Sequence, residues 1–416
     1  MHVLLATAGS RGDVAPYTGL GVRLAAEGHK VTIVTHGAFE EYVRACGLGF
    51  RGLPGDPRET MQSAHGQRWS QSKSSAVGLF RQMKVLKSEM VNGALALAEV
   101  AAEEGPDVLL AAPLVASVGY VTAKGLGIPS AGVFLAPGYP TREFAPVLSK
   151  GGSFGPVGNL LAGRAMTRVL AMTMGSATAA VRERFGLPKI AIGDALRRQD
   201  AEKWPAFHGY SRHVIPRPAD WREGLEVTGY WWPHVAPGYE PPAELVEFLD
   251  AGPPPVFIGF GSMVPGDGER LGRLAATALR QAGVRGVIQA GWADLSSVAD
   301  ENVISIGDVP HEWLFPQMAA VVHHAGAGTS AAAMRAGVPA VPVPVLADQP
   351  FWSVRLAELG VATPAVPMQS ITADRLGAAI HAAVTEPGYR ERTTALAKLI
   401  NAEDGPAPVV EYLNRL

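Results

Sequence analysis

Short apolar runs alternate with longer helical patterns along the first half of the chain. Strands are expected at residues 2–7, 30–35, 106–112 and 130–136, and helices at residues 17–28 and 118–126. Strands that alternate with helices are typical of a parallel sheet with crossover helices. The first half of the chain therefore predicts a doubly wound α/β domain.

The same alternation restarts after residues 229–242, GYWWPHVAPGYEPP, which follow neither a helical nor a strand period. Prolines and aromatic residues without a period are typical of a linker. Beyond it, strands are expected at 254–262, 286–291, 302–307, 319–326 and 339–345, and helices from about residue 269 to 282 and up to residue 336. This pattern predicts a second α/β domain of similar size.

The length of 416 residues is enough for two hydrophobic cores, because single cores rarely grow beyond ~250 residues. The patterns divide the chain into an N-terminal domain at 1–228, the linker at 229–242 and a C-terminal domain at 243–394. A closing segment at 395–416 is expected to form a helix to Ile400 and, after a break at EDGPAP, a second helix.

Composition narrows the possible functions. The formal net charge of -2 gives no electrostatic reason to expect a nucleic-acid partner. The one cysteine, Cys46, and the eleven histidines show no metal-ligand spacing, so no metal site is expected. The start, MHVLLATAGSRGD, indicates a first strand rather than a signal peptide, and residues 108–137 are too interrupted to span a membrane. A soluble, cytoplasmic protein is expected.

The first strand-to-helix turn does not fit a nicotinamide-binding domain. Its residues are Gly9-Ser10-Arg11-Gly12-Asp13, not the G-x-G-x-x-G fingerprint, and the second strand ends at His36 rather than at an acidic residue. We therefore do not expect dinucleotide binding here.

A second strand-to-helix turn, in VVHHAGAGTSAAAM at 321–334, fits a phosphate. Gly326, Gly328 and Thr329 lie where a helix would present unpaired N–H groups and the positive end of its dipole. His324 could donate one more hydrogen bond. Alternatively, His323 and His324 are buried core residues and the glycines only make a tight turn.

Two further stretches of the second domain favour phosphate binding over the alternative of buried core histidines. GFGSM at 259–263 offers another such turn with Ser262, and two anion sites in one domain suit a diphosphate. LADQPFWS at 346–353 places Asp348 and Gln349 at the carboxyl end of a strand, where open α/β sheets bind ligands. These two side chains could hold sugar hydroxyls.

Four stretches together carry a family resemblance: GSRGDVAPYTGLGVRLAAEGHKVTIVTH, FIGFGSM, VPHEWLFPQMAAVVHHAGAGTSAAAMRAGVP and VLADQPFWSVRLAELGVA. The chain resembles the family 1 glycosyltransferases of the GT-B fold, in the branch of sterol glucosyltransferases and antibiotic-tailoring transferases. The resemblance implies two facing Rossmann-like domains with a cleft between them, and a terminal helix that crosses back to the N-terminal domain. It also implies an inverting transfer of a hexose from UDP-glucose or a TDP-sugar to a hydrophobic acceptor, with no metal or other cofactor.

By position, the resemblance assigns a donor site in the second domain. His324 and the turn of Gly326, Gly328 and Thr329 would contact the diphosphate with help from Ser262, and Asp348 and Gln349 would hold the sugar. Trp292 and the backbone of Val309 would frame the base. The family usually has glycine where this chain has Ala325, which is unfavourable if the position needs a positive φ.

The acceptor side is expected in the first domain. Asp13, just beyond the first strand, is the candidate base for the acceptor hydroxyl; its alternative role is a cap for the following helix. Arg11 could contact phosphate or acceptor, or be a solvated surface residue. The segments 58–95 and 138–175 would shape an acceptor pocket, or simply pack on their own domain, and their apolar candidates are Trp69, Phe80, Met83, Phe144 and Phe154. Stable membrane attachment is not expected.

Two other functions stay open at this point. The acceptor could be a lipid-linked or cell-wall precursor, or the protein could be a non-catalytic accessory protein of the same fold.

Overall fold

The computed structural model describes residues 1–56, 76–149, 152–235, 238–260, 268–289 and 301–416, without the side chains of 76–86. The chain forms two compact units. The first comprises Met1–Pro146, Ser153–Ala236 and Asp404–Leu416, and the second comprises Val147–Gly152 and Pro237–Glu403. The main division at residues 236 and 237 falls within the segment predicted as a linker.

The first unit is built on a seven-stranded parallel sheet in the order β3-β2-β1-β4-β5-β6-β7. The strands are β1 (His2–Ala6), β2 (Lys30–His36), β3 (Gly49–Leu53), β4 (Val108–Ala111), β5 (Ser130–Phe134), β6 (Ala206–His208) and β7 (Leu225–Val227). The apolar residues of β1 and β4 are fully buried, as continuous apolar runs of a sheet covered on both faces should be.

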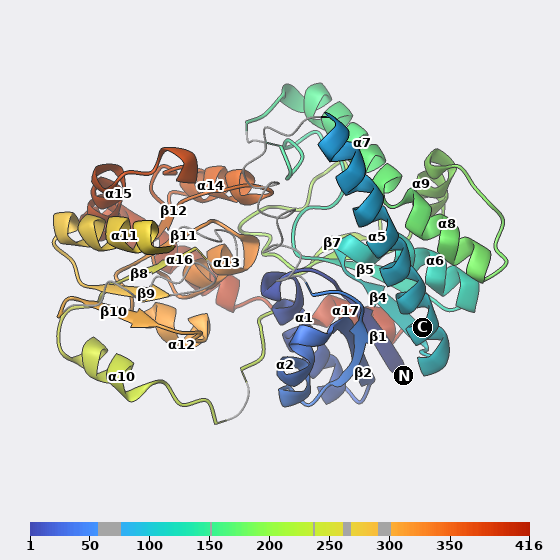
Figure 1. The fold of residues 1–416 in the computed structure, drawn as a ribbon, viewed down its shortest axis with the longest axis horizontal. Coiled ribbons are helices and arrows are strands. Elements are labelled where there is room, and N and C mark those ends of the chain that lie inside the picture. Colours follow the sequence, from blue (N-terminus) through green and yellow to red (C-terminus); the bar gives the residue numbers. More distant parts are fainter. Residues whose placement is uncertain (57–75, 150–151, 236–237, 261–267, 290–300) are drawn as a thin grey trace. The chain divides into compact units, whose positions relative to one another are not determined.

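Eight of the described helices belong to the first unit (Figure 1). They are α1 (Arg11–Ala26), α2 (Glu40–Ala45), α5 (Ala76–Glu104), α6 (Ala116–Leu126), α7 (Gly155–Thr173), α8 (Gly175–Arg184), α9 (Ile192–Ala201) and α17 (Ala407–Leu413). Helix α1 begins six residues before the predicted residue 17 and ends at Ala26. Its start is shifted because Ser10 and Asp13 cap it ahead of Pro16.

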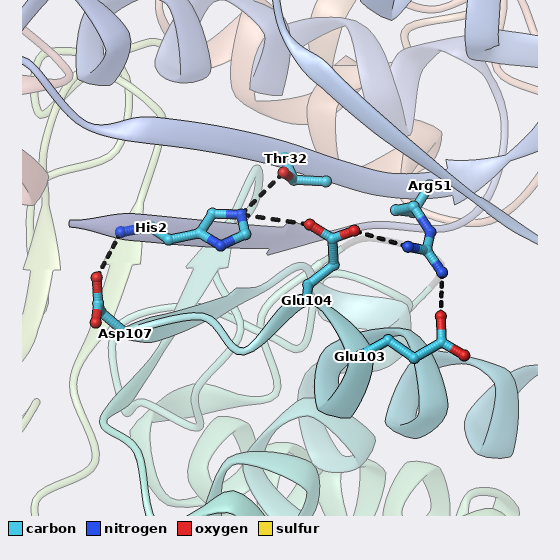
Figure 2. A network of polar contacts seen from close by, with 6 residues as sticks. All are labelled: His2, Thr32, Arg51, Glu103, Glu104 and Asp107. Carbon is cyan, nitrogen blue, oxygen red and sulfur yellow. Dashed lines mark hydrogen bonds and ion pairs between the residues drawn. The ribbon is translucent and has the colours of Figure 1, made fainter.

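A polar network ties the amino ends of the central strands to the end of α5 (Figure 2). The backbone N–H of His2 donates to Asp107 (2.6 Å), and its Nε2 lies 3.0 Å from the Thr32 hydroxyl and 3.7 Å from Glu104. Arg51 pairs with Glu104 at 2.7 Å and with Glu103. The network lies at the amino end of β1, away from its carboxyl end.

Only the last part of the closing segment, Asp404–Leu416, packs into the first unit, whereas α16 (Pro387–Asn401) belongs to the second. Val409, Val410 and Leu413 of α17 join the core cluster that contains residues of α1 and β1. The indole N–H of Trp231, in the first part of the predicted linker, donates to the carbonyl of Gly405 at 3.1 Å. The segment that leads into the Pro237–Glu403 part of the second unit and the segment that follows it therefore lie side by side within the first unit.

The second unit has a five-stranded parallel sheet in the order β10-β9-β8-β11-β12. Its strands are β8 (Val256–Gly259), β9 (Gly286–Gln289), β10 (Val303–Ile306), β11 (Ala320–His323) and β12 (Ala340–Pro342). Its helices are α10 (Ala243–Asp250), α11 (Gly268–Ala282), α12 (His311–Leu314), α13 (Ala327–Arg335), α14 (Gln349–Glu358), α15 (Ala373–Thr385) and α16 (Pro387–Asn401). The prediction of two parallel α/β domains is confirmed.

Alternate residues of β8 face the two layers of the second core. Val256 and Ile258 pack with α11 and α15, whereas Phe257 packs with α12 and α13. Figure 1 shows α11 and α15 on one face of this sheet and α12 on the other. Among the helices of the described ranges, none is both long and apolar enough to cross a membrane.

Candidate functional site

Each sheet has one point at which the direction of its strand order reverses. In the first unit this point lies between β1 and β4, and in the second it lies between β8 and β11. Open α/β sheets bind ligands outside the carboxyl ends of strands at such points. Asp13 follows β1, and the turn with His324 follows β11. Both candidate residues are therefore placed where this fold binds ligands.

The turn after β11 has a strained but well-supported backbone. Ala325 has φ +62°, in the left-handed region that favours glycine, and it is fully buried. Its N–H donates to Nδ1 of His323 at 3.0 Å. The expected difficulty with alanine at this position is real, and the His323 ring holds the turn in that conformation.

The two adjacent histidines have different environments. His323 is fully buried, and burial, with smaller effects of His324 and His311, lowers its pKa to about 3. Since its Nδ1 accepts a hydrogen bond, its proton is on Nε2, which has no partner within the described residues. His323 is thus the buried core histidine of the alternative interpretation, although only one of its two ring nitrogens has a hydrogen-bond partner in the described part of the chain.

His324 is half-buried at the rim of the turn, and burial lowers its pKa to about 4. It is therefore neutral near pH 7 and offers one N–H donor. Its Nδ1 is buried without a partner in the described part of the chain. A Cβ at Gly326 would lie 2.4 Å from its Nε2, so the ring occupies the space that a side chain at Gly326 would need.

Helix α13 begins directly after this turn, with Gly326 as its N-cap. The first backbone N–H of α13 that bonds within the helix is that of Ser330, which donates to the Gly326 carbonyl at 3.0 Å. The N–H groups of the residues between them, including Gly328 and Thr329, have no partner inside the helix. Together with the helix dipole, these donors can hold an anion.

Beyond β12, Asp348 lies at the N-cap of α14, and Ala347 before it has φ +57°. The Asp348 carboxylate accepts a hydrogen bond from the indole of Trp352 at 2.9 Å. A left-handed alanine costs about 1–2 kcal/mol, and such residues persist only where the surroundings determine them. Two of the loops that were expected to bind the donor thus each contain a left-handed alanine.

Gln349 is buried at the start of α14. Its Oε1 accepts hydrogen bonds from the backbone N–H groups of Val345 (2.7 Å) and Leu346 (3.0 Å). The amide oxygen therefore shapes the loop, and the amide NH₂ is the part of this side chain that can donate a further hydrogen bond.

Val309, Ser262 and Trp292 are the remaining donor-site candidates. Val309 follows β10, its side chain packs in the core, and its backbone has no hydrogen bond within the described ranges. Ser262 and Trp292 lie outside the described residues. Their assigned roles stay predictions, as do those of the other donor residues.

Asp13 is half-buried in the first turn of α1. Its Oδ2 accepts hydrogen bonds from the backbone N–H (2.8 Å) and the hydroxyl (2.9 Å) of Ser10. Gly9 precedes them with φ +121°, and a Cβ there would lie 2.5 Å from Oδ2. The expected capping role is therefore present, and it leaves Oδ1 as the oxygen that can take a proton.

Burial raises the pKa of Asp13 above its ordinary value, and the two hydrogen bonds from Ser10 lower it in part. A carboxylate with a raised pKa is a stronger base than a solvated one, which favours proton transfer in the transition state. Capping and base catalysis are compatible here because they use different oxygens.

The acceptor candidates are not brought into one described cluster. Arg11 is exposed, with its guanidinium 5.1 Å from the centre of the Tyr42 ring. Phe144 is half-buried, and Phe154 is 58% exposed at the N-cap of α7. Trp69 lies outside the described residues, and Phe80 and Met83 lie in α5 where side chains are not described. In the described ranges, no group of histidine, cysteine and acidic residues could hold a metal ion.

Solved structures share this architecture. The glycosyltransferase of kitacinnamycin aligns with 100% of this chain and 98% of its own at a TM-score of 0.71 and 21% identity. The calicheamicin glycosyltransferase aligns with 100% and 97% at a TM-score of 0.69 and 20% identity. The two parallel α/β units thus define a protein with the GT-B fold of two Rossmann-like domains.

Sequence comparison gives the family. Residues 3–145 match the glycosyltransferase family 28 N-terminal domain, and 286–416 match the erythromycin biosynthesis protein CIII-like C-terminal domain. O-mycaminosyltylonolide 6-deoxyallosyltransferase of Streptomyces fradiae is 34% identical over 97% of this chain and 95% of its own length. The chain belongs to the family 1 glycosyltransferases of the GT-B fold.

Sterol glucosyltransferases are similar as well. The sterol 3-beta-glucosyltransferase of Candida albicans is 33% identical over 99% of this chain, and that of Arabidopsis thaliana is 31% identical over 100% of it. The chain spans 27% of the length of the Candida protein and 68% of the Arabidopsis protein.

Proposed function

We propose that this chain is an inverting, metal-independent glycosyltransferase that moves a hexose from UDP-glucose or a TDP-sugar to a hydroxyl of a hydrophobic small molecule. The observation that carries the proposal is the turn between β11 and α13. It combines unpaired helix N–H groups, a neutral His324 and a strained Ala325 at a strand-order reversal.

The donor diphosphate would bind at the N-terminus of α13. Its negative charge grows as the bond to the sugar breaks, and preorganised N–H donors stabilise that charge without a cation. His324 adds an N–H donor, and Ser262 a hydroxyl. Asp348 and the Gln349 NH₂ would orient the sugar, while Trp292 and the backbone of Val309 would frame the base.

Asp13 would act as the base on the acceptor. The acceptor oxygen attacks the anomeric carbon, the carbon–oxygen bond to the diphosphate breaks, and the hydroxyl proton goes to Oδ1 of Asp13. A single displacement from the face opposite the leaving group inverts the anomeric configuration. Arg11, Trp69, Phe80, Met83 and Phe144 would contact the acceptor.

We also propose a cytoplasmic location and the division of the chain that the sequence predicts, at 1–228, 229–242, 243–394 and 395–416. UDP and TDP donors are both retained because the relatives include sterol glucosyltransferases and a 6-deoxyallosyltransferase. A lipid-linked or cell-wall acceptor is the second candidate. Consumption of a soluble steroid without detergent would count against this second candidate.

A thermal-shift screen with UDP, TDP and GDP tests the donor part. We expect UDP or TDP to raise the unfolding temperature, because a ligand that binds only the folded state stabilises it. His324→Ala should abolish most of this shift, whereas His381→Ala, an exposed histidine in α15, should preserve it. A shift that His324→Ala leaves intact would refute the donor-site assignment.

Mass spectrometry with mixed sterol and polyketide acceptors tests the transfer part. The wild-type protein should add one hexose mass to an acceptor hydroxyl in a reaction that a metal chelator leaves unchanged. Binding of the nucleotide without any transfer or hydrolysis would favour the non-catalytic accessory protein.

A further inference from the structure

Helix α7 carries its large apolar side chains on the outside. Six large apolar residues at this helix or its N-cap are between 48% and 61% exposed: Phe154, Val157, Leu161, Val169, Leu170 and Met172. Its buried residues are Asn159 and Gly163. This is the reverse of the pattern by which a surface helix usually packs on its domain.

The geometry of the helix confirms that the apolar face points away from the core. A Cβ at Gly163 would lie 3.0 Å from Pro140, so this side of α7 packs closely on its own unit. Phe154 and Met172 are each nine residues from Gly163, which is two and a half turns and therefore the opposite side. Leu161, seven residues after Phe154, lies on that same outer side.

Positive charge accompanies this face. Arg164 and Arg168 are exposed and follow Leu161 by three and seven residues, and α7 has no acidic residue. Residues 153–201 contain seven lysines or arginines and three acidic residues, whereas the whole chain has a formal net charge of -2. The segment is therefore locally basic in a chain that is not.

We propose that the outer face of α7, defined by Phe154, Val157, Leu161, Val169 and Met172 with Arg164 and Arg168, docks reversibly onto an anionic lipid bilayer. Exposed aromatic and aliphatic side chains beside arginines are the features by which interfacial helices bind such surfaces. A second copy of the chain fits less well, because a two-fold contact would bring the same basic face against itself.

Two arginines and a short apolar face give weak adsorption, in keeping with the expectation that attachment is not stable. The proposal goes beyond glycosyl transfer. Binding to vesicles needs neither donor nor acceptor. Vesicle binding can therefore be absent while the proposed transfer activity is present, and vesicle binding can be present while the transfer activity is absent.

Vesicle flotation of the full chain tests the proposal. The protein should float with vesicles that contain phosphatidylserine in phosphatidylcholine, bind pure phosphatidylcholine less, and detach as salt screens the charges. Arg164→Gln and Arg168→Gln should each weaken binding to the anionic vesicles about fivefold. Leu161→Gln should weaken it roughly tenfold by removing an apolar side chain from the interface.

The matched control is Leu399→Gln, which changes a leucine of α16 that is 49% exposed. It should leave vesicle binding unchanged, and all variants should unfold at the wild-type temperature. Absence of wild-type binding, or equal binding by Leu161→Gln, would overturn the proposal. A dimer in sedimentation velocity that Leu161→Gln abolishes would overturn it as well, by showing that the face joins two copies.

Discussion

The hydrogen bond between His323 and Ala325 gives a prediction that separates positioning from packing. His323→Phe keeps an aromatic ring but removes Nδ1, the acceptor of the Ala325 N–H. His323→Asn makes a smaller side chain, but its Oδ1 is the same number of bonds from the backbone as Nδ1. His323→Phe thus preserves the ring but not the acceptor atom, whereas His323→Asn preserves an acceptor atom but not the ring.

The magnitude follows from the burial of this turn. Ala325 is fully buried, so its N–H cannot find water when Nδ1 is lost. An unsatisfied buried donor costs about 1–3 kcal/mol, which corresponds to roughly 5-fold to 150-fold in an equilibrium constant. Relaxation of the turn out of its left-handed conformation would relieve this cost and would displace the donors that bind the diphosphate.

Calorimetric titration with UDP or TDP, together with thermal unfolding, measures both effects. His323→Phe should weaken nucleotide binding within that 5-fold to 150-fold range. His323→Asn should lose stability, because the smaller side chain leaves a cavity, and still bind the nucleotide nearly as well as the wild type. Equal affinities of His323→Phe and the wild type would refute the positioning role of His323.

Substitutions at Gly326 and Ser10, and a change of pH, each perturb a single contact or titratable group. Gly326→Ala should reduce nucleotide affinity more than tenfold in the same titration, because its Cβ would lie 2.4 Å from Nε2 of His324; wild-type affinity would contradict the turn geometry. Ser10→Ala removes one of the hydrogen bonds that lower the pKa of Asp13, so the acidic limb of the kcat/KM profile should move to higher pH, and an unmoved limb would exclude Asp13 as the base. Burial lowers the pKa of His208 and His323 to about 3 in the folded state, from 6.5, so the unfolded state binds more protons between these values. Urea unfolding should accordingly show stability falling as the pH drops below about 6.5, by up to ~1.4 kcal/mol per pH unit for each histidine, and a flat profile down to pH 4 would contradict their burial.

The repeating strand and helix pattern could be predicted from the sequence because most strands are buried on both faces and have long apolar runs. The short strands β3, β6 and β7 were not predicted. Strands β6 and β7 have three residues each, AFH and LEV, which are too few for a period. They are strands because they pair with β5 and with each other, which is a property of the tertiary fold.

Some features of the candidate site could likewise be predicted from the sequence, and others could not. The glycines and His324 after β11 are visible as a motif, and the alanine in place of the usual family glycine signalled an unusual backbone at Ala325. The role of His323 as an acceptor for that alanine, and of Gln349 as an acceptor for its own loop, could not be read from the sequence. Each depends on a side chain that turns back toward a neighbouring backbone N–H.

Glycosyl transfer by the Asp13→Asn variant measures whether Asp13 is the base. Asparagine keeps an oxygen that can accept the Ser10 hydrogen bonds, so the start of α1 should persist, but it cannot take the acceptor proton. The wild-type protein should glycosylate a hydrophobic hydroxyl acceptor from a UDP- or TDP-sugar. We expect Asp13→Asn to bind the donor with wild-type affinity and to transfer the sugar roughly 10²-fold to 10⁴-fold more slowly. Unchanged transfer by this variant would contradict the assignment of Asp13 as the base and leave it as a helix cap.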